Sequence, residues 1–141
     1  MDMAGTLQRL PVFAAALWWG SLTTIGFLVV PLLFMHLPTP ALAGGMAAKL
    51  FTAQTWVSVA CGGILLLIST SKQASAPAQR AHDAIIFILL GLLLALLVEF
   101  AVAPRIVTRT NLKLWHSVGS VMYLVQWLCA AIVFWRITPK H

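Results

Sequence analysis

Four long apolar runs dominate this sequence and constrain its fold more than any other feature. They cover residues 11–35, 50–69, 84–103 and 114–135. Each run has the length of roughly 20 residues that an α-helix needs to cross the hydrocarbon core of a bilayer. A backbone in lipid must satisfy its own hydrogen bonds, which leaves helices and closed barrels as spanning structures. The sequence therefore predicts an all-α integral membrane protein, an up-down bundle of four transmembrane helices.

The composition agrees with this class and limits the number of domains. Of the 141 residues, 61% are hydrophobic and only 9% are charged, whereas about a quarter of a soluble domain is charged. Four spans with short connections use nearly all of the chain, so we expect a single domain over residues 1–141. The first run is too long for the apolar region of a signal peptide, which has about 7 to 15 residues.

The basic residues indicate a membrane surface rather than nucleic acid. Nine Lys and Arg against three acids give a net charge of +6, but they stand singly at the ends of apolar runs, where they contact lipid phosphates. With an even number of spans, both termini lie on one side, called here the near face, and the loops after the first and third spans lie at the far face. The near face holds Arg9, Lys72, Arg80, Arg136 and Lys140, and the far face holds Lys49, Arg105, Arg109 and Lys113. This small excess slightly favours cytoplasmic termini in a bacterial inner membrane.

Polar side chains inside the apolar runs are the first candidates for function, because polar groups in hydrocarbon are costly and often face a pathway. Two stripes at helical spacing contain them: His116, Ser120, Tyr123 and Trp127 in the fourth run, and Gln54, Ser58 and Cys61 in the second.

Glu99 is the only acid well inside a run. Up-down topology predicts that it lies in one layer near the far face with His36, Gln54 and His116. Three interpretations stay open. Glu99 pairs with His116, Gln54 or an arginine as a structural tie, or it lines a small polar cavity open to the far face, with Glu99 and His116 as proton carriers or ligand contacts. In the third, the Glu99 side chain snorkels to the membrane interface.

The sequence contains no strong metal or catalytic motif. His36 and His116 are the one weak candidate pair for a metal, and we expect no cofactor and no catalytic residues. Cys61 and Cys129 stand alone in apolar runs at different depths, which predicts two free thiols. No internal repeat is evident from the residues.

Several short motifs resemble the bacterial branch of the transmembrane-protein-205-like family. They are Leu17 to Gly20, Gly26 to Phe34, Leu37-Pro38, Ala43-Gly44, Leu50-Phe51, Cys61-Gly62 and Asn111 to Ser117. The resemblance implies a four-helix membrane fold of poorly defined role, and handling of small molecules or metals, because eukaryotic relatives are associated with resistance to platinum drugs. It directs attention to Arg109, Asn111, Trp115 and His116.

A fainter likeness links Gly26, Pro31 and Phe34 to the haem-containing four-helix protoporphyrinogen oxidases and the copper-resistance protein D group. Those oxidases have a histidine in the first half of the first helix, and residues 10–20 contain none.

We therefore predict a non-enzymatic membrane protein: a small-molecule or ion-handling module or an accessory subunit, in a homo-oligomer or membrane complex, with a polar layer near one membrane face. The alternative is a haem-dependent membrane redox enzyme. The ligand or proton candidates are Glu99, His116, Gln54, Ser58, Ser120, Tyr123, Arg109, Asn111 and Trp115.

Overall fold

The computed structural model describes residues 3–71 and 75–139, which are helical nearly throughout and include no strand. Four of its helical stretches are long and apolar enough to cross a membrane: Gln8–His36, Pro40–Ser69, Ile85–Val107 and Leu112–Ile137. The predicted all-α membrane fold is confirmed, and the chain is a multi-pass membrane protein.

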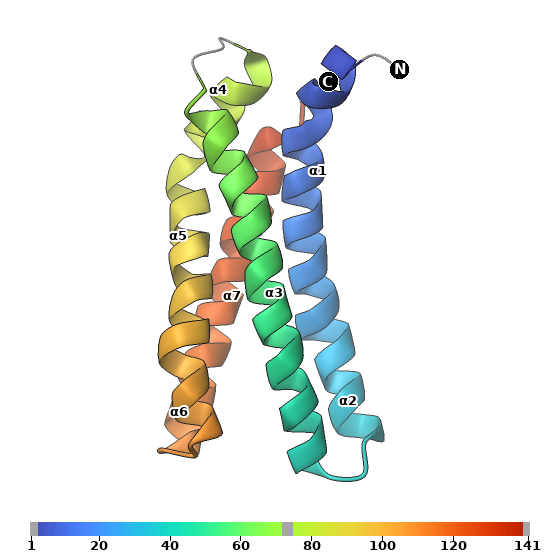
Figure 1. Ribbon diagram of the computed structural model, residues 1–141, viewed down its shortest axis with the longest axis vertical. Coiled ribbons are helices and arrows are strands. Elements are labelled where there is room, and N and C mark those ends of the chain that lie inside the picture. The colour runs from blue at the N-terminus through green and yellow to red at the C-terminus, as the bar shows by residue number, and fades with distance from the viewer. Residues whose placement is uncertain (1–2, 72–74, 140–141) are drawn as a thin grey trace.

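The first and third spans are each built from three segments. The first contains α1 (Met3–Thr24), the π-helical η1 (Ile25–Val29) and α2 (Val30–His36), and the third contains α5 (Ile85–Leu97), the π-helical η2 (Val98–Val102) and α6 (Ala103–Val107). The second and fourth spans are the continuous helices α3 (Pro40–Ser69) and α7 (Leu112–Ile137). Figure 1 shows that α1 begins and α7 ends at the same end of the bundle, while the α2–α3 and α6–α7 loops lie at the other.

The helix α3 begins at Pro40, well before the predicted start at Leu50. Thr39 caps it, because its side chain accepts a hydrogen bond from the Leu42 N–H, and proline is well tolerated in a first helical turn. Ala43 and Ala47 are buried in this added part, and α2 packs against α3. Tertiary packing therefore keeps residues 40–49 helical, although this segment contains Gly44 and Gly45, which are weak helix formers.

The second connection also contains structure that the sequence did not predict. The short helix α4 (Ala76–Asp83) begins after Ser75, whose side chain accepts a hydrogen bond from the Ala78 N–H. Ala78 and Ala81 on this helix are buried. The helix α4 packs against α3 and α7 and so covers the near end of the bundle.

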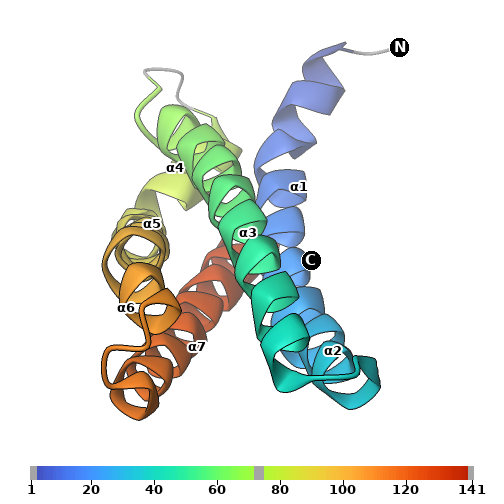
Figure 2. The same ribbon diagram turned by 60° about the horizontal axis from the view of Figure 1, so that its bottom comes forward.

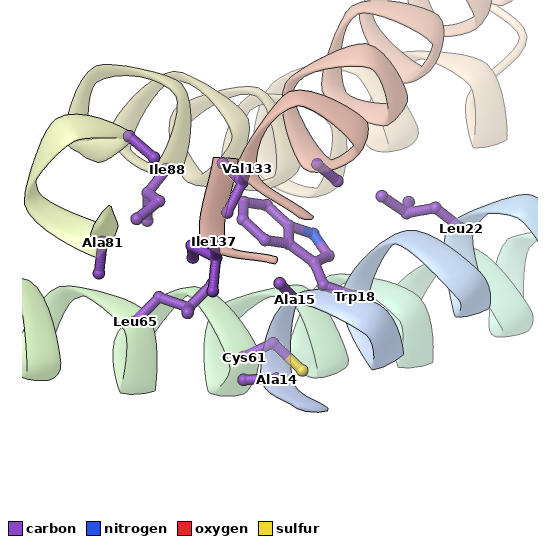
Figure 3. Packing of buried hydrophobic residues seen from close by; sticks show 12 residues of the cluster. Ala14, Ala15, Trp18, Leu22, Cys61, Leu65, Ala81, Ile88, Val133 and Ile137 are labelled. Carbon is purple, nitrogen blue, oxygen red and sulfur yellow. The ribbon is translucent and has the colours of Figure 1, made fainter. Parts of the chain in front are cut away.

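The apolar core occupies the near half of the bundle. Its buried members come from α1, α3, α4, α5 and α7, with the fully buried Trp18 indole at its centre (Figure 3). In the far half, α2 and α6 contain no buried residue among those that the structure describes. Figure 2 shows the α2/α3 pair and the α6/α7 pair diverging toward the far face. The bundle is thus closed at the near face and splayed at the far face.

The two π-helical segments lie at matching positions. In each case the second residue after the π-helix is a proline, Pro31 or Pro104. In both spans the residue after the π-helix donates its N–H five residues back, Val30 to Ile25 and Ala103 to Val98. Proline lacks an N–H and clashes with the carbonyl four residues earlier, and a π-turn is one way for a helix to absorb that disruption.

Candidate functional site

Two buried glutamines join three helices near the middle of the bundle. Gln54 lies close to the midpoint of α3 and is 2% exposed, and Gln126 lies close to the midpoint of α7 and is 3% exposed. Gln54 Nε2 donates to Ser21 Oγ on α1 at 3.0 Å, and Gln126 Nε2 donates to Ser58 Oγ on α3 at 3.1 Å. We call Ser21, Gln54, Ser58 and Gln126 the amide layer.

Ser58 is the centre of this layer. Its side chain is fully buried. Its hydroxyl donates to the backbone carbonyl of Gln54, one turn earlier, at 3.0 Å. The same oxygen accepts from Gln126 and lies 3.4 Å from Gln54 Nε2. Ser58 therefore uses its donor and its acceptor capacity at once.

One acceptor of the layer is left over. Gln54 Oε1 is buried, and no described residue donates a hydrogen bond to it. Leaving a buried carbonyl oxygen without a donor costs about 1 to 3 kcal/mol. Most buried polar groups in native proteins are paired, so an unpaired one calls for an explanation, such as a ligand or an ion.

The amide layer marks the boundary between the closed and the splayed halves of the bundle. Toward the near face, Cys61 and Leu65 on α3, and Ala130 and Val133 on α7, belong to the apolar core. Toward the far face lie the diverging ends of the helices.

Glu99 has a partner that the sequence analysis did not single out. Thr52 Oγ1 on α3 donates to both carboxylate oxygens, at 2.9 Å to Oε1 and 3.1 Å to Oε2. Glu99 thus has a hydroxyl donor in place of the predicted partners His116, Gln54 or an arginine. Glu99 lies in η2 and is half-buried, on the far side of the amide layer. Thr52 was missed because it lies two residues before Gln54, off the stripe of Gln54, Ser58 and Cys61.

The predicted α7 stripe divides into two parts. Tyr123 donates its hydroxyl to the Leu22 carbonyl at 2.7 Å, and Trp127 Nε1 donates to Thr23 Oγ1 at 2.8 Å. Closer to the far face, His116 and Ser120 are exposed, and Ser120 Oγ donates to the His116 carbonyl at 2.9 Å. The stripe therefore holds α7 against α1 at one end and stays uncovered where the helices splay.

A glycine makes room for the tyrosine contact. A Cβ at Gly26 in η1 would lie 2.5 Å from Tyr123 Cε1. Such a distance is essentially never seen, so Gly26 is needed for the Tyr123 ring to reach the α1 backbone.

The far-face loop holds the remaining predicted positions. Arg109 and Asn111 are exposed and left-handed, with φ of 56° and 47°, a conformation that asparagine tolerates better than most residues. The centroid of the Trp115 ring lies 4.6 Å from Arg105 Cζ, which is a cation–π contact. Arg109 and Asn111 take no part in it.

Metal ligation has little support in the described residues, among which no group of three His, Cys, Asp or Glu side chains converges. His36, at the end of α2, is exposed like His116. Cys61 and Cys129 are both free, as predicted.

Of the predicted positions, the structure joins Gln54 to Ser58 and leaves His116, Arg109 and Asn111 outside that group. Gln126, the second glutamine of the amide layer, was missed. Its signal was present, because a glutamine in an apolar run is as unusual as Gln54, but it lies off the stripe of Tyr123 and Trp127.

Comparison with known proteins gives a family without an activity. The model of a family described as a domain of unknown function (DUF4149) matches residues 13–114, from the first span into the start of the fourth. Comparison with curated proteins found no significant match, and comparison with solved structures found none either.

Proposed function

This chain belongs to the DUF4149 family, and from that premise we propose that it handles a small polar molecule or ion at the amide layer inside the membrane. The observation that carries the proposal is Gln54, which is 2% exposed and has an amide oxygen without a donor. Its amide nitrogen is already held by Ser21. A ligand with a hydrogen to donate, or a cation, would satisfy the oxygen without breaking the existing contacts.

A purely structural role explains the layer less well. Hydrogen bonds between transmembrane helices contribute on average about 0.6 kcal/mol, which is less than the cost of the unpaired oxygen at Gln54. Leucine in place of both glutamines would give apolar packing at no such cost. Retention of two buried amides therefore supports a binding role.

We place the entry of the ligand at the far face, past the Phe51 and Tyr123 rings, which contact each other about one turn beyond the amide layer on that side. The helices diverge there, whereas the apolar core and α4 close the near end. Glu99 and Thr52 lie between the far-face ends and the amide layer. A carboxylate in that position favours cations or hydrogen-bond donors over anions.

Three further parts belong to this proposal. The chain lies in a bacterial inner membrane with cytoplasmic termini, on the distribution of Lys and Arg. It works as a homo-oligomer or in a membrane complex, because four helices alone enclose little space. Its resemblance to the transmembrane-protein-205-like family is consistent with small-molecule handling.

The test is saturable binding of radiolabelled sodium, rubidium and acetamide to the purified protein, measured by scintillation proximity. We expect at least one probe to bind, Gln54→Leu to lose that binding, and Gln79→Leu to keep it, because Gln79 is an exposed glutamine on α4. Both variants must melt within a few degrees of the parent. Binding of none of the probes, or equal binding by Gln54→Leu, overturns the proposal.

A further inference from the structure

We infer that the chain consists of two copies of one helical hairpin, residues 8–69 and 81–137, related by an approximate two-fold axis along the bundle. This inference is independent of the proposed function. It rests on four features that the two halves share: the π-helices with their prolines, the buried positions of the outgoing spans, the buried positions and glutamines of the returning helices, and the contacts along the axis.

The first feature is a matched motif in the outgoing spans. Ile25-Gly-Phe-Leu-Val-Val-Pro31 aligns without a gap on Val98-Glu-Phe-Ala-Val-Ala-Pro104, with phenylalanine, valine and proline identical at three positions. The first five residues of each motif form the π-helix, and the residue after it makes the same backbone hydrogen bond. Since π-helices are rare, two in the same register are a specific signal.

The second feature is the register of the buried residues in these spans. Counting back from the matched prolines, four of the five buried positions described in α1 fall on buried positions of the other half: Pro11 on Ala84, Ala15 on Ile88, Trp18 on Gly91, and Leu22 on Ala95. The fifth, Ala14, falls on the half-buried Phe87. The spacing of four, three and four alone is common to helices in bundles. Its alignment with the π-helix and the proline is what distinguishes a repeat.

The returning helices match in the same way. Aligning the start of α3 with the start of α7 superposes Gln54 on Gln126, Ser58 on Ala130, Cys61 on Val133, and Leu65 on Ile137, all of them buried. It also places Phe51 on Tyr123, two aromatic residues in the same turn. Identity is low, but the alignment keeps these four positions buried in both helices and superposes the one buried amide of each helix.

Equivalent residues meet at the centre of the bundle. Phe51 and Tyr123 contact each other edge to face, with ring centroids 5.3 Å apart. Trp18 covers Gly91, where a Cβ would lie 2.8 Å from the indole ring (Figure 3 shows Trp18 in this core). A residue that touches its own equivalent lies on the symmetry axis. The axis therefore runs between α1 and α5 and between α3 and α7.

Helix neighbours obey the same symmetry. The contact of α1 with α3 corresponds to that of α5 with α7, and the contact of α1 with α7 to that of α5 with α3, and all four are present. Any up-down bundle of four helices shares this arrangement, so it agrees with the repeat without proving it. The matched π-helices and glutamines carry the inference.

The copies differ where the axis allows only one side chain. Two tryptophans would collide at the position of Trp18 and Gly91, and one hydroxyl, that of Ser58, already serves both glutamines. By the two-fold relation, a serine at position 130 would accept from Gln54 across the axis and from Gln126 one turn earlier on α7. Position 130, where the chain has alanine, is thus the place equivalent to Ser58 at which a serine hydroxyl would reach both glutamines.

Exchange of the hydroxyl tests the repeat. Ser58→Ala should lower the melting temperature by about 2 to 6 °C, and Ser58→Ala with Ala130→Ser should regain at least half of that loss. Ser58→Ala with Ala95→Ser is the control, because Ala95 is a buried alanine equivalent to Leu22. Recovery in the control as well, or in neither double variant, contradicts the repeat at this pair.

A second exchange keeps the inference falsifiable if the serine effect is small. Trp18→Gly combined with Gly91→Trp should melt higher than either single variant, because the indole returns to the same axial space from the other copy. The matched control is Gly62→Leu with Leu92→Gly, another tight pair whose members are not equivalent. This exchange also relieves overpacking, but it does not return the side chain to an equivalent place, so it should recover less than the axial exchange. Failure of both exchanges, or equal recovery in the controls, overturns the inference. Neither readout involves a ligand, so the binding test can fail while the repeat stands.

Discussion

Thr52 on α3 donates its hydroxyl to both oxygens of the Glu99 carboxylate on η2, at 2.9 and 3.1 Å. The contact joins the two halves of the chain on the far side of the amide layer. It also places the only acid well inside a span next to a donor that carries no charge. Variants of Thr52 and Glu99 therefore distinguish a carboxylate that only links two helices from one that takes part in function.

Replacement of Glu99 by glutamine separates these two roles. The amide oxygen still accepts from Thr52, so we expect Glu99→Gln to lose at most about 1 to 2 kcal/mol of stability. Probe binding should fall only as far as the fraction of folded protein falls. Thr52→Val is the matched control, since it removes the donor and keeps the acid. A Glu99→Gln protein that melts like the parent but binds no probe would show that the carboxylate itself is functional.

Substitution of Gly26 should destabilise the bundle. Gly26→Ala places a methyl group 2.5 Å from Tyr123 Cε1, and overpacking of this kind costs about 1 to 3 kcal/mol. Gly20→Ala, in the same span, has no atom within 4 Å of the added carbon and should be neutral or slightly stabilising. The comparison is made from melting temperatures in one detergent, and equal melting of the two variants would contradict the close approach of Tyr123.

Cysteine labelling tests the four-span topology. In a background with Cys61 and Cys129 replaced by alanine, Ser75→Cys at the start of α4 and Thr110→Cys in the α6–α7 loop should react with an impermeant maleimide from opposite sides of the membrane. Labelling of both from one side would rule out an up-down bundle. The side on which Ser75→Cys reacts also reports the orientation, for which we expect the cytoplasm.

An absorption spectrum tests the haem alternative. We expect the purified protein to have no Soret band at stoichiometric strength. The two histidines that the analysis considered as ligands, His36 and His116, are both exposed. A strong Soret band that disappears in His116→Ala but persists in His82→Ala would establish haem binding and contradict our preference for a protein that is not an enzyme.

The sequence by itself determined the class of the protein and the number of its spans. Transfer of an apolar run into lipid is a local property, because each run of about 20 residues satisfies its own backbone and needs no knowledge of its neighbours. For the same reason Gln54, Ser58 and Glu99 stood out as polar residues in apolar surroundings. The start of α3 at Pro40 was missed, because the glycine pair that follows is helical only through packing against α2.

Only the tertiary structure decided which polar groups meet. A helix surrounded by lipid is apolar on every face, so its sequence says little about its rotation or depth, and these set the partners of Gln126, Thr52 and Ser21. The repeat was hidden for a related reason. Its two halves share few identical residues. They agree at eight pairs of buried positions and in where the helix widens into a π-turn, properties that exist only once the helices have packed.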